Sequence, residues 1–161
     1  MSEGATEKHV GGYQFLVLSE EDRDLIEQIE SLEKEVFGAG GLNIWMLSPL
    51  IRHGLVCALV NEERLVGASC EWILSLSSRD TAHLLGMSVR QGLRGIGLGR
   101  LLLRSSLSVL LRSGITRADL TVDPANQLAL ALYRSEGFRE YSFSKDEYGK
   151  GEDRIIMRLE L

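Results

Sequence analysis

A glycine-rich turn joins a β-type run to a helical run near the middle of the chain, and few fold classes accommodate such a junction. The β-type run is Thr81–Val89, and the apolar helix after the turn is predicted to extend to about Arg112. The turn itself, 94–99, reads Arg-Gly-Ile-Gly-Leu-Gly. A strand that leads directly into a helix has to bury that helix against a sheet, so the chain is expected to fold in the α/β class.

The residues before this turn predict strands and two helices. The strands expected there are Tyr13–Leu18, Leu55–Val60 and Leu65–Leu74, with a hairpin turn at 61–64. A helix is expected from Glu20 to Gly38, because Ser19 and Asp22 have capping-box spacing, and its apolar face is assigned to packing. A loop is predicted at 39–48, followed by a short helix that has Ser48 as its cap and Pro49 as its first position and that runs to His53.

The residues after the turn continue as β-α-β-α-β. The expected elements are a strand at Ala118–Val122, a helix at Gln127–Glu136, and strands at Glu140–Phe143 and Arg154–Leu159. Strands first and alternating elements afterwards predict a mixed α/β sheet. We expect a flexible N-terminus at 1–12 and a single domain at 13–161.

The composition is that of an ordinary globular protein, with 44% hydrophobic and 25% charged residues. Its 18 basic and 23 acidic residues give a net charge of −5, which leaves no basic footprint for nucleic acid. No apolar run approaches the roughly 20 residues that span a bilayer, and residues 1–12 are unlike a secretory signal. We therefore expect a cytoplasmic protein with no nucleic-acid and no membrane partner.

Cysteines and histidines give no sign of a redox or metal site. Cys57 and Cys70 lie in apolar β-type runs without C-x-x-C spacing and are predicted to be buried, reduced thiols. His9, His53 and His83 are scattered, and no metal-binding motif occurs. We expect neither a bound metal nor a cysteine nucleophile.

The glycine-rich turn has the properties of a phosphate-binding loop. Alternate glycines let a ligand approach the backbone amides, and the following helix presents the positive end of its dipole. Arg94 and Arg100 add cationic side chains that suit a phosphorylated ligand.

Other interpretations of this turn remain from the residues alone. A P-loop is excluded, because its Lys-[Ser/Thr] pair is missing. A dinucleotide-binding turn requires Gly-x-Gly-x-x-Gly, whereas Arg100 stands where the last turn of that motif begins. Asp119 has about the right distance for a ribose ligand but lies early in its strand, which disfavours that role. A glycine-rich turn with no ligand is the remaining alternative.

Two motifs in this order resemble the GNAT superfamily of acetyl-CoA-dependent N-acetyltransferases. The first is R-x-x-G-x-G, from Arg94 to Gly99, at a strand-to-helix junction. The second is LTVDPANQLALALYRSEGF at 120–138, which is similar to the bacterial ribosomal-protein alanine N-acetyltransferase branch. The resemblance covers 13–161. It implies a mostly antiparallel, twisted central sheet with helices on both faces, splayed between the strand ending at Val89 and the strand at 118–122.

The resemblance also implies how acetyl-CoA, the expected cosubstrate, would bind. The pantetheine arm would pair with the main chain of the splayed strand, and the pyrophosphate would bind the amides of the turn. The residues expected to bind it are Met87, Ser88, Val89, Arg94, Gly95, Ile96, Gly97, Leu98, Gly99, Arg100, Asn126 and Tyr133. Asn126 also has the position of a helix N-cap, and the two roles are compatible.

The reaction implied is transfer of an acetyl group to a primary amine by direct attack in a ternary complex. A backbone amide near Val89 would contact the developing oxyanion, and Tyr133 would act as the general acid that protonates the departing thiolate. From the residues alone, the simpler interpretation of Tyr133 is a core tyrosine on an apolar helix face.

One position departs from the pattern of that branch. Thr121 stands where the branch carries the glutamate that serves as general base, and threonine cannot serve as one. Glu71, retained as the candidate base, and Asp119 are the possible replacements. A neutral amine or a water chain to solvent are the alternatives. The departure also leaves open a catalytically impaired CoA-binding or regulatory module.

The acceptor, a peptide or a small-molecule amine, is expected to contact the first helices, the loop Gly40–Pro49 and the segment 144–153. Within that loop, Trp45 is predicted to be a partly buried lid aromatic rather than a substrate-stacking residue. The segment 144–153 is predicted to be a solvated hairpin loop, and Tyr148 in it has no assigned role. Edge strands near the C-terminus would allow a homodimer.

Overall fold

Two apolar runs form the antiparallel strands β3 (Leu55–Val60) and β4 (Val66–Leu74) of the computed structural model. The expected hairpin turn joins them. The Asn61 side chain accepts a hydrogen bond from the N–H of Leu65 at 2.9 Å, and Arg64 has a positive φ of 62°. Every residue of β3 is buried. Because alternate residues of a strand point to opposite faces, both faces of β3 are covered by other elements.

The structure describes residues 9–161, which divide into two compact units. Unit 1 contains the chain up to Ile73 together with Leu85–Ser106, and unit 2 contains Leu74–Leu84 together with Leu107–Leu161. Strand β5 (Thr81–Val89) and helix α3 (Leu98–Arg112) therefore contribute residues to both units. The single domain expected from the sequence stays a prediction.

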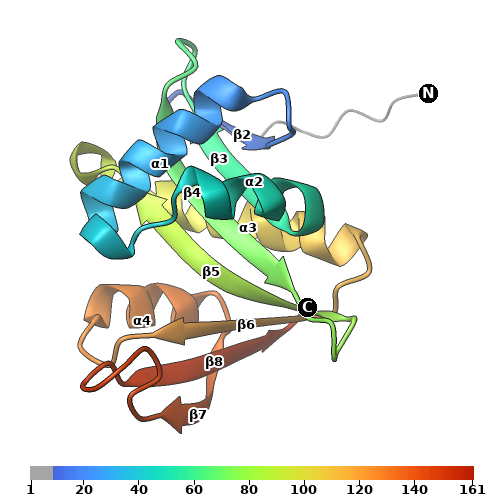
Figure 1. The fold of residues 1–161 in the computed structure, drawn as a ribbon, viewed down its shortest axis with the longest axis vertical. Helices are drawn as coiled ribbons and strands as arrows, with labels where there is room; N and C mark the ends of the chain where they lie inside the picture. Colours follow the sequence, from blue (N-terminus) through green and yellow to red (C-terminus); the bar gives the residue numbers. More distant parts are fainter. Residues whose placement is uncertain (1–8) are drawn as a thin grey trace. The chain divides into compact units, whose positions relative to one another are not determined.

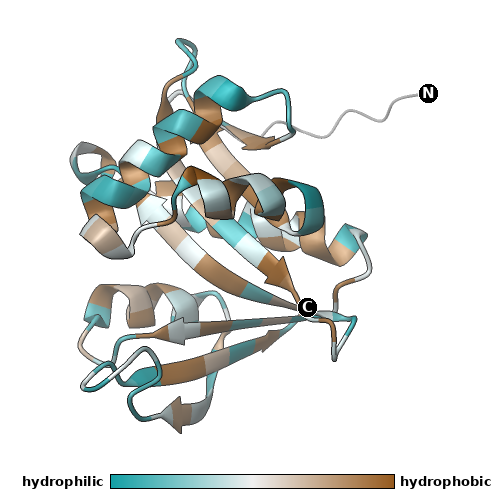
Figure 2. Ribbon diagram, viewed as in Figure 1, coloured by the Kyte–Doolittle hydropathy of each residue, from teal (hydrophilic) through white to brown (hydrophobic). Residues whose placement is uncertain are grey.

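Helices α1 (Arg23–Phe37) and α2 (Ile44–His53) cover one face of the unit 1 strands (Figure 1). The apolar stripe of α1 packs with the even-numbered residues of β3 in one cluster. Its members on these two elements are Leu25, Ile26, Ile29, Leu32, Val56, Ala58 and Val60. Figure 2 shows the same stripe as alternating hydrophobic and hydrophilic colours along α1. The first turns of α3 lie behind these strands (Figure 1), so helices occupy both faces, as predicted.

Helix α1 begins at Arg23, so the predicted start at Glu20 is wrong. The predicted capping pair does form contacts: the Asp22 carboxylate accepts hydrogen bonds from the N–H and the hydroxyl of Ser19, at 2.8 and 3.0 Å. Asp22 itself, with φ −85° and ψ 46°, is outside the helical range and is the N-cap residue. The pair therefore closes a turn that precedes the helix. At the other end, α1 leads into the one-turn 3-10 helix η1 (Gly38–Gly40).

Helix α2 begins at Ile44, within the segment predicted to be a loop, so the predicted start at Pro49 is wrong, whereas the predicted end at His53 is confirmed. Asn43 is its N-cap, and the Asn43 side chain accepts a hydrogen bond from the N–H of Trp45 at 3.1 Å. A carboxylate of α1 adds a second acceptor, because Glu30 accepts the N–H of Ile44 at 2.9 Å. A tertiary contact thus contributes to the start of α2, and the local sequence does not show it.

A short N-terminal hairpin precedes α1. Strands β1 (His9–Val10) and β2 (Tyr13–Val17) pair antiparallel, and β2 also pairs with β3, so the order in unit 1 is β1-β2-β3-β4. Gly11 and Gly12 form the turn, with φ of +58° and +79°. Strand β1 falls within the segment expected to be flexible, and residues 1–8 of that segment lie outside the described residues.

Unit 2 contains one parallel and two antiparallel strand pairs. Strand β5 pairs in parallel with β6 (Arg117–Val122), and β8 (Arg154–Glu160) pairs antiparallel with β6 and with β7 (Arg139–Ser144). The order is β5-β6-β8-β7, and helix α4 (Gln127–Ser135) follows β6 in the chain. The predicted mixed, mostly antiparallel α/β fold is confirmed. Strand β7 is last in the order, and a homodimer through an edge strand stays a prediction.

Cys57 and Cys70 are register partners on β3 and β4, and both are buried free thiols, as predicted. A hydrogen bond with Cys70 and burial raise the pKa of the Cys57 thiol. Separately, none of the helices within residues 9–161 has both the length and the apolar character needed to cross a bilayer.

Candidate functional site

The glycine-rich turn begins the candidate site, in unit 1. After β5, the one-turn 3-10 helix η2 (Gln91–Leu93) leads into the turn, and α3 begins directly behind it. Gly95 and Gly97 have φ of +81° and +92°, a region that side-chain-bearing residues rarely adopt. The Gly97 carbonyl accepts the N–H of Leu101 at 3.0 Å, so helical hydrogen bonding starts at Gly97. The main chain from Gly97 to Gly99 therefore forms the N-terminus of α3, where the first N–H groups of a helix lie ahead of its hydrogen-bond ladder.

The space around these two glycines fits an anionic ligand. A Cβ built on Gly95 or Gly97 would meet nothing within 4 Å, so crowding by the protein does not explain the glycines. The residues from Arg94 to Gly97 are exposed. The Arg94 N–H is donated to the Gln91 carbonyl at 3.4 Å, whereas Gly95, Ile96 and Gly97 leave an exposed stretch of chain directly before the helix N-terminus. This combination suits a phosphate or pyrophosphate.

Two arginines fix the turn to the rest of unit 1. The Arg94 guanidinium donates a hydrogen bond to the Val89 carbonyl at 3.2 Å, which ties the turn to the end of β5. Arg90 donates its main-chain N–H to Gly67 O at 2.9 Å and its guanidinium to Val66 O at 3.2 and 3.3 Å. The same guanidinium pairs with Glu35 on α1 at 3.0 Å. The turn is therefore anchored at its entry and open at its glycines.

Strand β5 leaves its parallel partner before it reaches the turn. Within the described residues, the ladder between β5 and β6 covers Thr81–Leu84 and Arg117–Leu120. Strand β5 continues to Val89 and β6 to Val122. The ladder thus ends before either strand does. Of the expected cofactor residues there, Ser88 is buried, while Met87 and Val89 are half-buried.

Two buried carboxylates lie beside this part of β5. Glu33 on α1 is 1% exposed and accepts two hydrogen bonds, from the Leu42 N–H at 3.0 Å and from the Ser88 hydroxyl at 2.5 Å. Glu71 on β4 is fully buried, and neither of its carboxylate oxygens has a hydrogen-bond partner among the described residues. A Cβ on Gly86 would lie 2.9 Å from Glu71 Oε2 and 3.7 Å from Glu33 Oε1, so both carboxylates approach β5 at Gly86.

Glu71 was a candidate from the sequence, but Glu33 was not. The sequence interpretation assigned the inward face of α1 to packing, and most of that face does pack. Glu33 nevertheless occupies the same stripe, seven residues after Ile26 and three before Val36. A charged residue within an apolar stripe is the sequence signal that could identify Glu33. Fully buried glutamates are rare unless they have partners, so such a residue is expected to have a specific contact.

Burial raises the pKa of the Glu71 carboxyl well above its ordinary value, and the charge of Glu33 nearby raises that pKa further. Glu71 therefore holds its proton to a higher pH in the folded chain than in the unfolded chain. A group of this kind contributes its stability below the unfolded pKa and loses it as the pH rises through the folded pKa. The free energy of unfolding should thus fall as the pH rises above about 4.5.

The variant Glu71→Gln tests this pH dependence, because glutamine keeps the shape of the side chain and cannot ionise. We expect a melting temperature close to wild type at pH 5 and at least about 3 °C above wild type at pH 8. Thermal unfolding followed by circular dichroism at both pH values measures the difference. Glu63→Gln, the same charge change in the exposed β3–β4 turn, is the control and should show no such divergence. Equal melting temperatures for Glu71→Gln and wild type at pH 8 would contradict the raised pKa.

The remaining predicted site residues, Asn126 and Tyr133, belong to helix α4 of unit 2. The Asn126 side chain accepts a hydrogen bond from the N–H of Ala129 at 3.1 Å, which confirms its N-cap role. Tyr133 is 8% exposed, and its ring meets Phe138 edge to face with centroids 5.8 Å apart. The ring of Tyr133 is thus held by packing.

Three other residues discussed in the sequence analysis have environments that the sequence did not predict. Trp45, predicted to be partly buried, is 86% exposed at the start of α2, so that prediction is wrong. Asp119, the second candidate base, forms a bidentate ion pair with Arg158 at 2.7 and 2.9 Å. The hydroxyl of Thr121 lies 2.8 Å from the hydroxyl of Tyr148, which reaches it from the β7–β8 hairpin.

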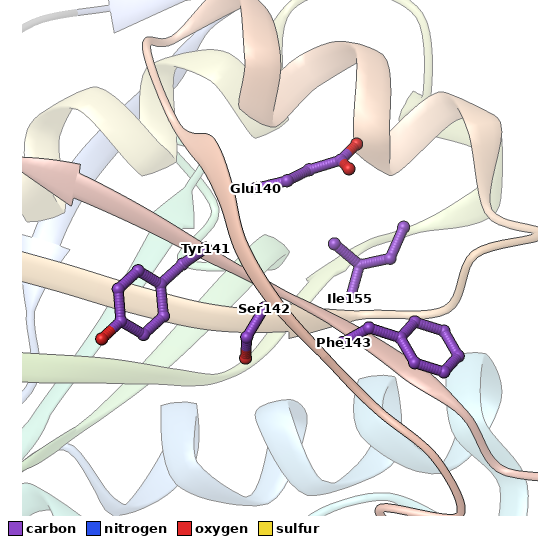
Figure 3. Close-up of a pocket in the computed structure, with 5 residues that line it drawn as sticks. All are labelled: Glu140, Tyr141, Ser142, Phe143 and Ile155. Carbon is purple, nitrogen blue, oxygen red and sulfur yellow. The ribbon is translucent and has the colours of Figure 1, made fainter.

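A shallow hollow on β7 and β8 contains none of the predicted site residues. It is lined by Glu140, Tyr141, Ser142, Phe143 and Ile155. Tyr141 projects to the opposite side of β7 from Glu140 and Ile155 (Figure 3). No cluster of three or more histidine, cysteine or acidic residues suited to a metal ion occurs in the part of the chain that the structure describes.

Comparison with known proteins gives one consistent result. Residues 17–138 match the acetyltransferase (GNAT) family. The chain is similar to the ribosomal protein bS18-alanine N-acetyltransferase of Salmonella typhimurium, with 36% identity over 83 residues, which cover 50% of this chain and 56% of that protein. The chain therefore spans little more than half the length of this curated relative.

Solved structures extend the similarity over nearly the whole chain. The ribosomal-protein-S18-alanine N-acetyltransferase of Escherichia coli aligns with a TM-score of 0.72 and 26% identity, covering 91% of this chain and 93% of that one. Ard1 from Thermoplasma volcanium aligns with a TM-score of 0.81 and 18% identity, covering 93% and 98%. At that identity the second comparison shows a common fold alone.

Proposed function

Because the chain belongs to the acetyltransferase (GNAT) family, we propose that it transfers an acetyl group from acetyl-CoA to a primary amine, by direct attack in a ternary complex. One observation carries the proposal. The main chain at Gly95 and Gly97 is open to solvent at the N-terminus of α3, directly after the segment of β5 that has left β6. An arrangement of this kind suits a diphosphate followed by an extended, amide-bearing arm.

In this proposal, the cofactor residues divide into two groups. The amides from Gly95 to Arg100 hold the pyrophosphate, and the side chains of Arg94 and Arg100 complement its charge. The main chain of Met87, Ser88 and Val89 pairs with the pantetheine arm. Asn126 and Tyr133 are the further cofactor residues that the sequence resemblance implies. Acetyl-CoA, when bound, supplies an acyl group activated as a thioester.

The chemical step needs an oxyanion contact, a general acid and an acceptor for the amine proton. The N–H of Val89 is the proposed oxyanion contact, and the phenol of Tyr133 donates its proton to the departing sulfur. Glu71 is the proposed base. Since burial raises its pKa, Glu71 accepts a proton only as the pH rises through that raised value, so we expect kcat to increase with pH on this limb.

A peptide N-terminus is the first acceptor that we propose. The support is the similarity to ribosomal-protein alanine N-acetyltransferases, which extends over half of this chain. Small-molecule amines are the alternative acceptors. Trp45, exposed at the start of α2, is an available contact for either kind of acceptor.

The test is CoA thiol release by the purified protein with acetyl-CoA and a panel of amines. The panel contains peptides with different N-terminal residues, N-terminally blocked versions of the same peptides, polyamines and free amino acids. We expect thiol release that depends on a free amine, with an acetylated product found by mass spectrometry. Release that is equal with blocked and free peptides would contradict transfer to the N-terminal amine.

A catalytically impaired CoA-binding module is the second candidate, favoured by Thr121 at the family's glutamate position and by the complete burial of Glu71. This alternative predicts that acetyl-CoA binds but that no amine in the panel increases thiol release. The same assay, combined with native mass spectrometry of the loaded protein, separates the two functions.

A further inference from the structure

Glu33 connects three segments of unit 1 that are far apart in the sequence. Its carboxylate is carried by α1, accepts the N–H of Leu42 just before α2, and accepts the hydroxyl of Ser88 near the end of β5. The two hydrogen bonds use different oxygens, Oε2 for Leu42 and Oε1 for Ser88. Both hydrogen bonds are buried, and Glu33 and Ser88 are each 1% exposed. Water therefore cannot easily replace either partner.

A second buried carboxylate lies close to Glu33. It belongs to Glu71, and both carboxylates approach Gly86. Two carboxylates in one apolar environment repel each other, and the charge of Glu33 raises the pKa of Glu71. Cys70 is the other titratable group that acts on Glu71. A residue that adds unfavourable charge to a core is a candidate for a role other than packing.

We propose that Glu33 is a positioning residue, which acts through the Ser88 hydroxyl to hold the Ser88–Val89 main chain in the geometry that acyl transfer requires. The inference rests on the proposed function, in which the N–H of Val89 contacts the oxyanion. Ser88 precedes Val89 directly, so a rotation at Ser88 changes the direction of that N–H. Displacement of a preorganised donor by about 1 Å can reduce a rate on the order of 100-fold.

Helix α1 also provides a matched control. Glu30 lies on the same helix and accepts a backbone N–H at the start of α2, that of Ile44, at 2.9 Å. Among the described residues, no hydrogen bond joins Glu30 to β5. Glu30→Gln and Glu33→Gln therefore make the same chemical change on one helix. Glu33 differs in its contact with Ser88, in its deeper burial and in its proximity to Glu71.

The test measures kcat and the KM for acetyl-CoA in the amine-dependent thiol-release assay, with thermal unfolding measured for each variant. We expect Glu33→Gln to lower kcat about tenfold or more and to change the KM less than about threefold, because the main-chain donor is misplaced while the phosphate turn is intact. Glu30→Gln should retain kcat within about twofold.

Ser88→Ala and the double variant Glu33→Gln/Ser88→Ala test whether Glu33 acts through Ser88. Each single variant should lower kcat. The kcat of the double variant should equal that of the less active single variant, and should not fall by the product of the two single-variant factors. Ser88→Thr, which restores a hydroxyl, should recover most of the activity of Ser88→Ala.

Two results would overturn this role. One is a kcat for Glu33→Gln within twofold of that for Glu30→Gln at matched stability. The other is independent, multiplying losses from Glu33 and Ser88. Failure of the proposed function is distinguishable from both, because the wild type itself would then show no amine-dependent release. If Glu33→Gln does not fold, the Ser88→Ala and Ser88→Thr pair decides: equal kcat values for the two would exclude the hydroxyl.

Discussion

Replacing Tyr133 by phenylalanine should lower kcat by about 100-fold to 1,000-fold while the KM for acetyl-CoA changes little. The phenol is the proposed donor of the proton to the departing thiolate, and a positioned general acid typically contributes 10²-fold to 10⁴-fold. The aromatic ring, buried against Phe138, is preserved in the variant, so packing is expected to survive. Steady-state thiol release measured over a range of acetyl-CoA concentrations separates kcat from KM.

Tyr141→Phe is the matched control for the loss of one phenol. Tyr141 lies on β7, where its ring is stacked by the Arg158 guanidinium at 3.7 Å, and it has no part in the proposed site. We expect its kcat to stay within about twofold of wild type. A kcat for Tyr133→Phe within threefold of wild type would remove Tyr133 as the general acid and return it to the role of a core tyrosine.

Gly97→Val should weaken acetyl-CoA binding by about 100-fold, which corresponds to about 2.7 kcal/mol. Gly97 has a φ of +92°, and holding a side-chain-bearing residue there costs about 1–3 kcal/mol. The valine side chain would also enter the open space over the turn, where the ligand is proposed to bind. The dissociation constant for acetyl-CoA, measured by equilibrium dialysis, reports the loss.

Gly92→Val, in the 3-10 helix η2 just before the turn, is the control. A Cβ on Gly92 also meets nothing within 4 Å, but the φ of Gly92 lies outside the positive region. Valine at Gly92 therefore adds bulk without the same backbone strain, and we expect a change in affinity below about threefold. Equal affinities for Gly97→Val and Gly92→Val would show that the geometry of Gly97 is not needed for binding.

The sequence predicts the turn well because its determinants are local. Strand-to-helix order, alternate glycines and an apolar helix are all visible within about 30 residues, and the structure forms each of them. The N-cap role of Asn126 is equally local, since the side chain bonds an amide three residues away.

Features that depend on tertiary contacts were predicted less well. The start of α2 is helped by a carboxylate of α1, Glu30, that is distant in sequence, so the local pattern suggested a later start. Ser19 and Asp22 bond as expected, but the backbone at Asp22 delays the helix to Arg23. Spacing alone identifies a hydrogen-bonded pair and does not fix the backbone angles between its members.

The environments of the two buried carboxylates also depend on tertiary contacts that the sequence does not reveal. The sequence identifies Glu71 as a candidate base on a strand. Its complete burial and its raised pKa depend on the packing of α1 over β4. Glu33 meets Ser88 only because α1 approaches β5 in unit 1, and the two residues are 55 positions apart in the chain. A single sequence contains no direct signal for a contact over that separation.

Calorimetric titration of the wild-type protein tests whether the main-chain amides from Gly95 to Arg100 bind the diphosphate of CoA. Two ligands are compared at low salt: CoA, and pantetheine, which has the thiol-bearing arm but no diphosphate. We expect saturable heat with CoA and an affinity for pantetheine at least about 100-fold lower. No binding of CoA, or equal affinity for the two ligands, would contradict this mode of binding.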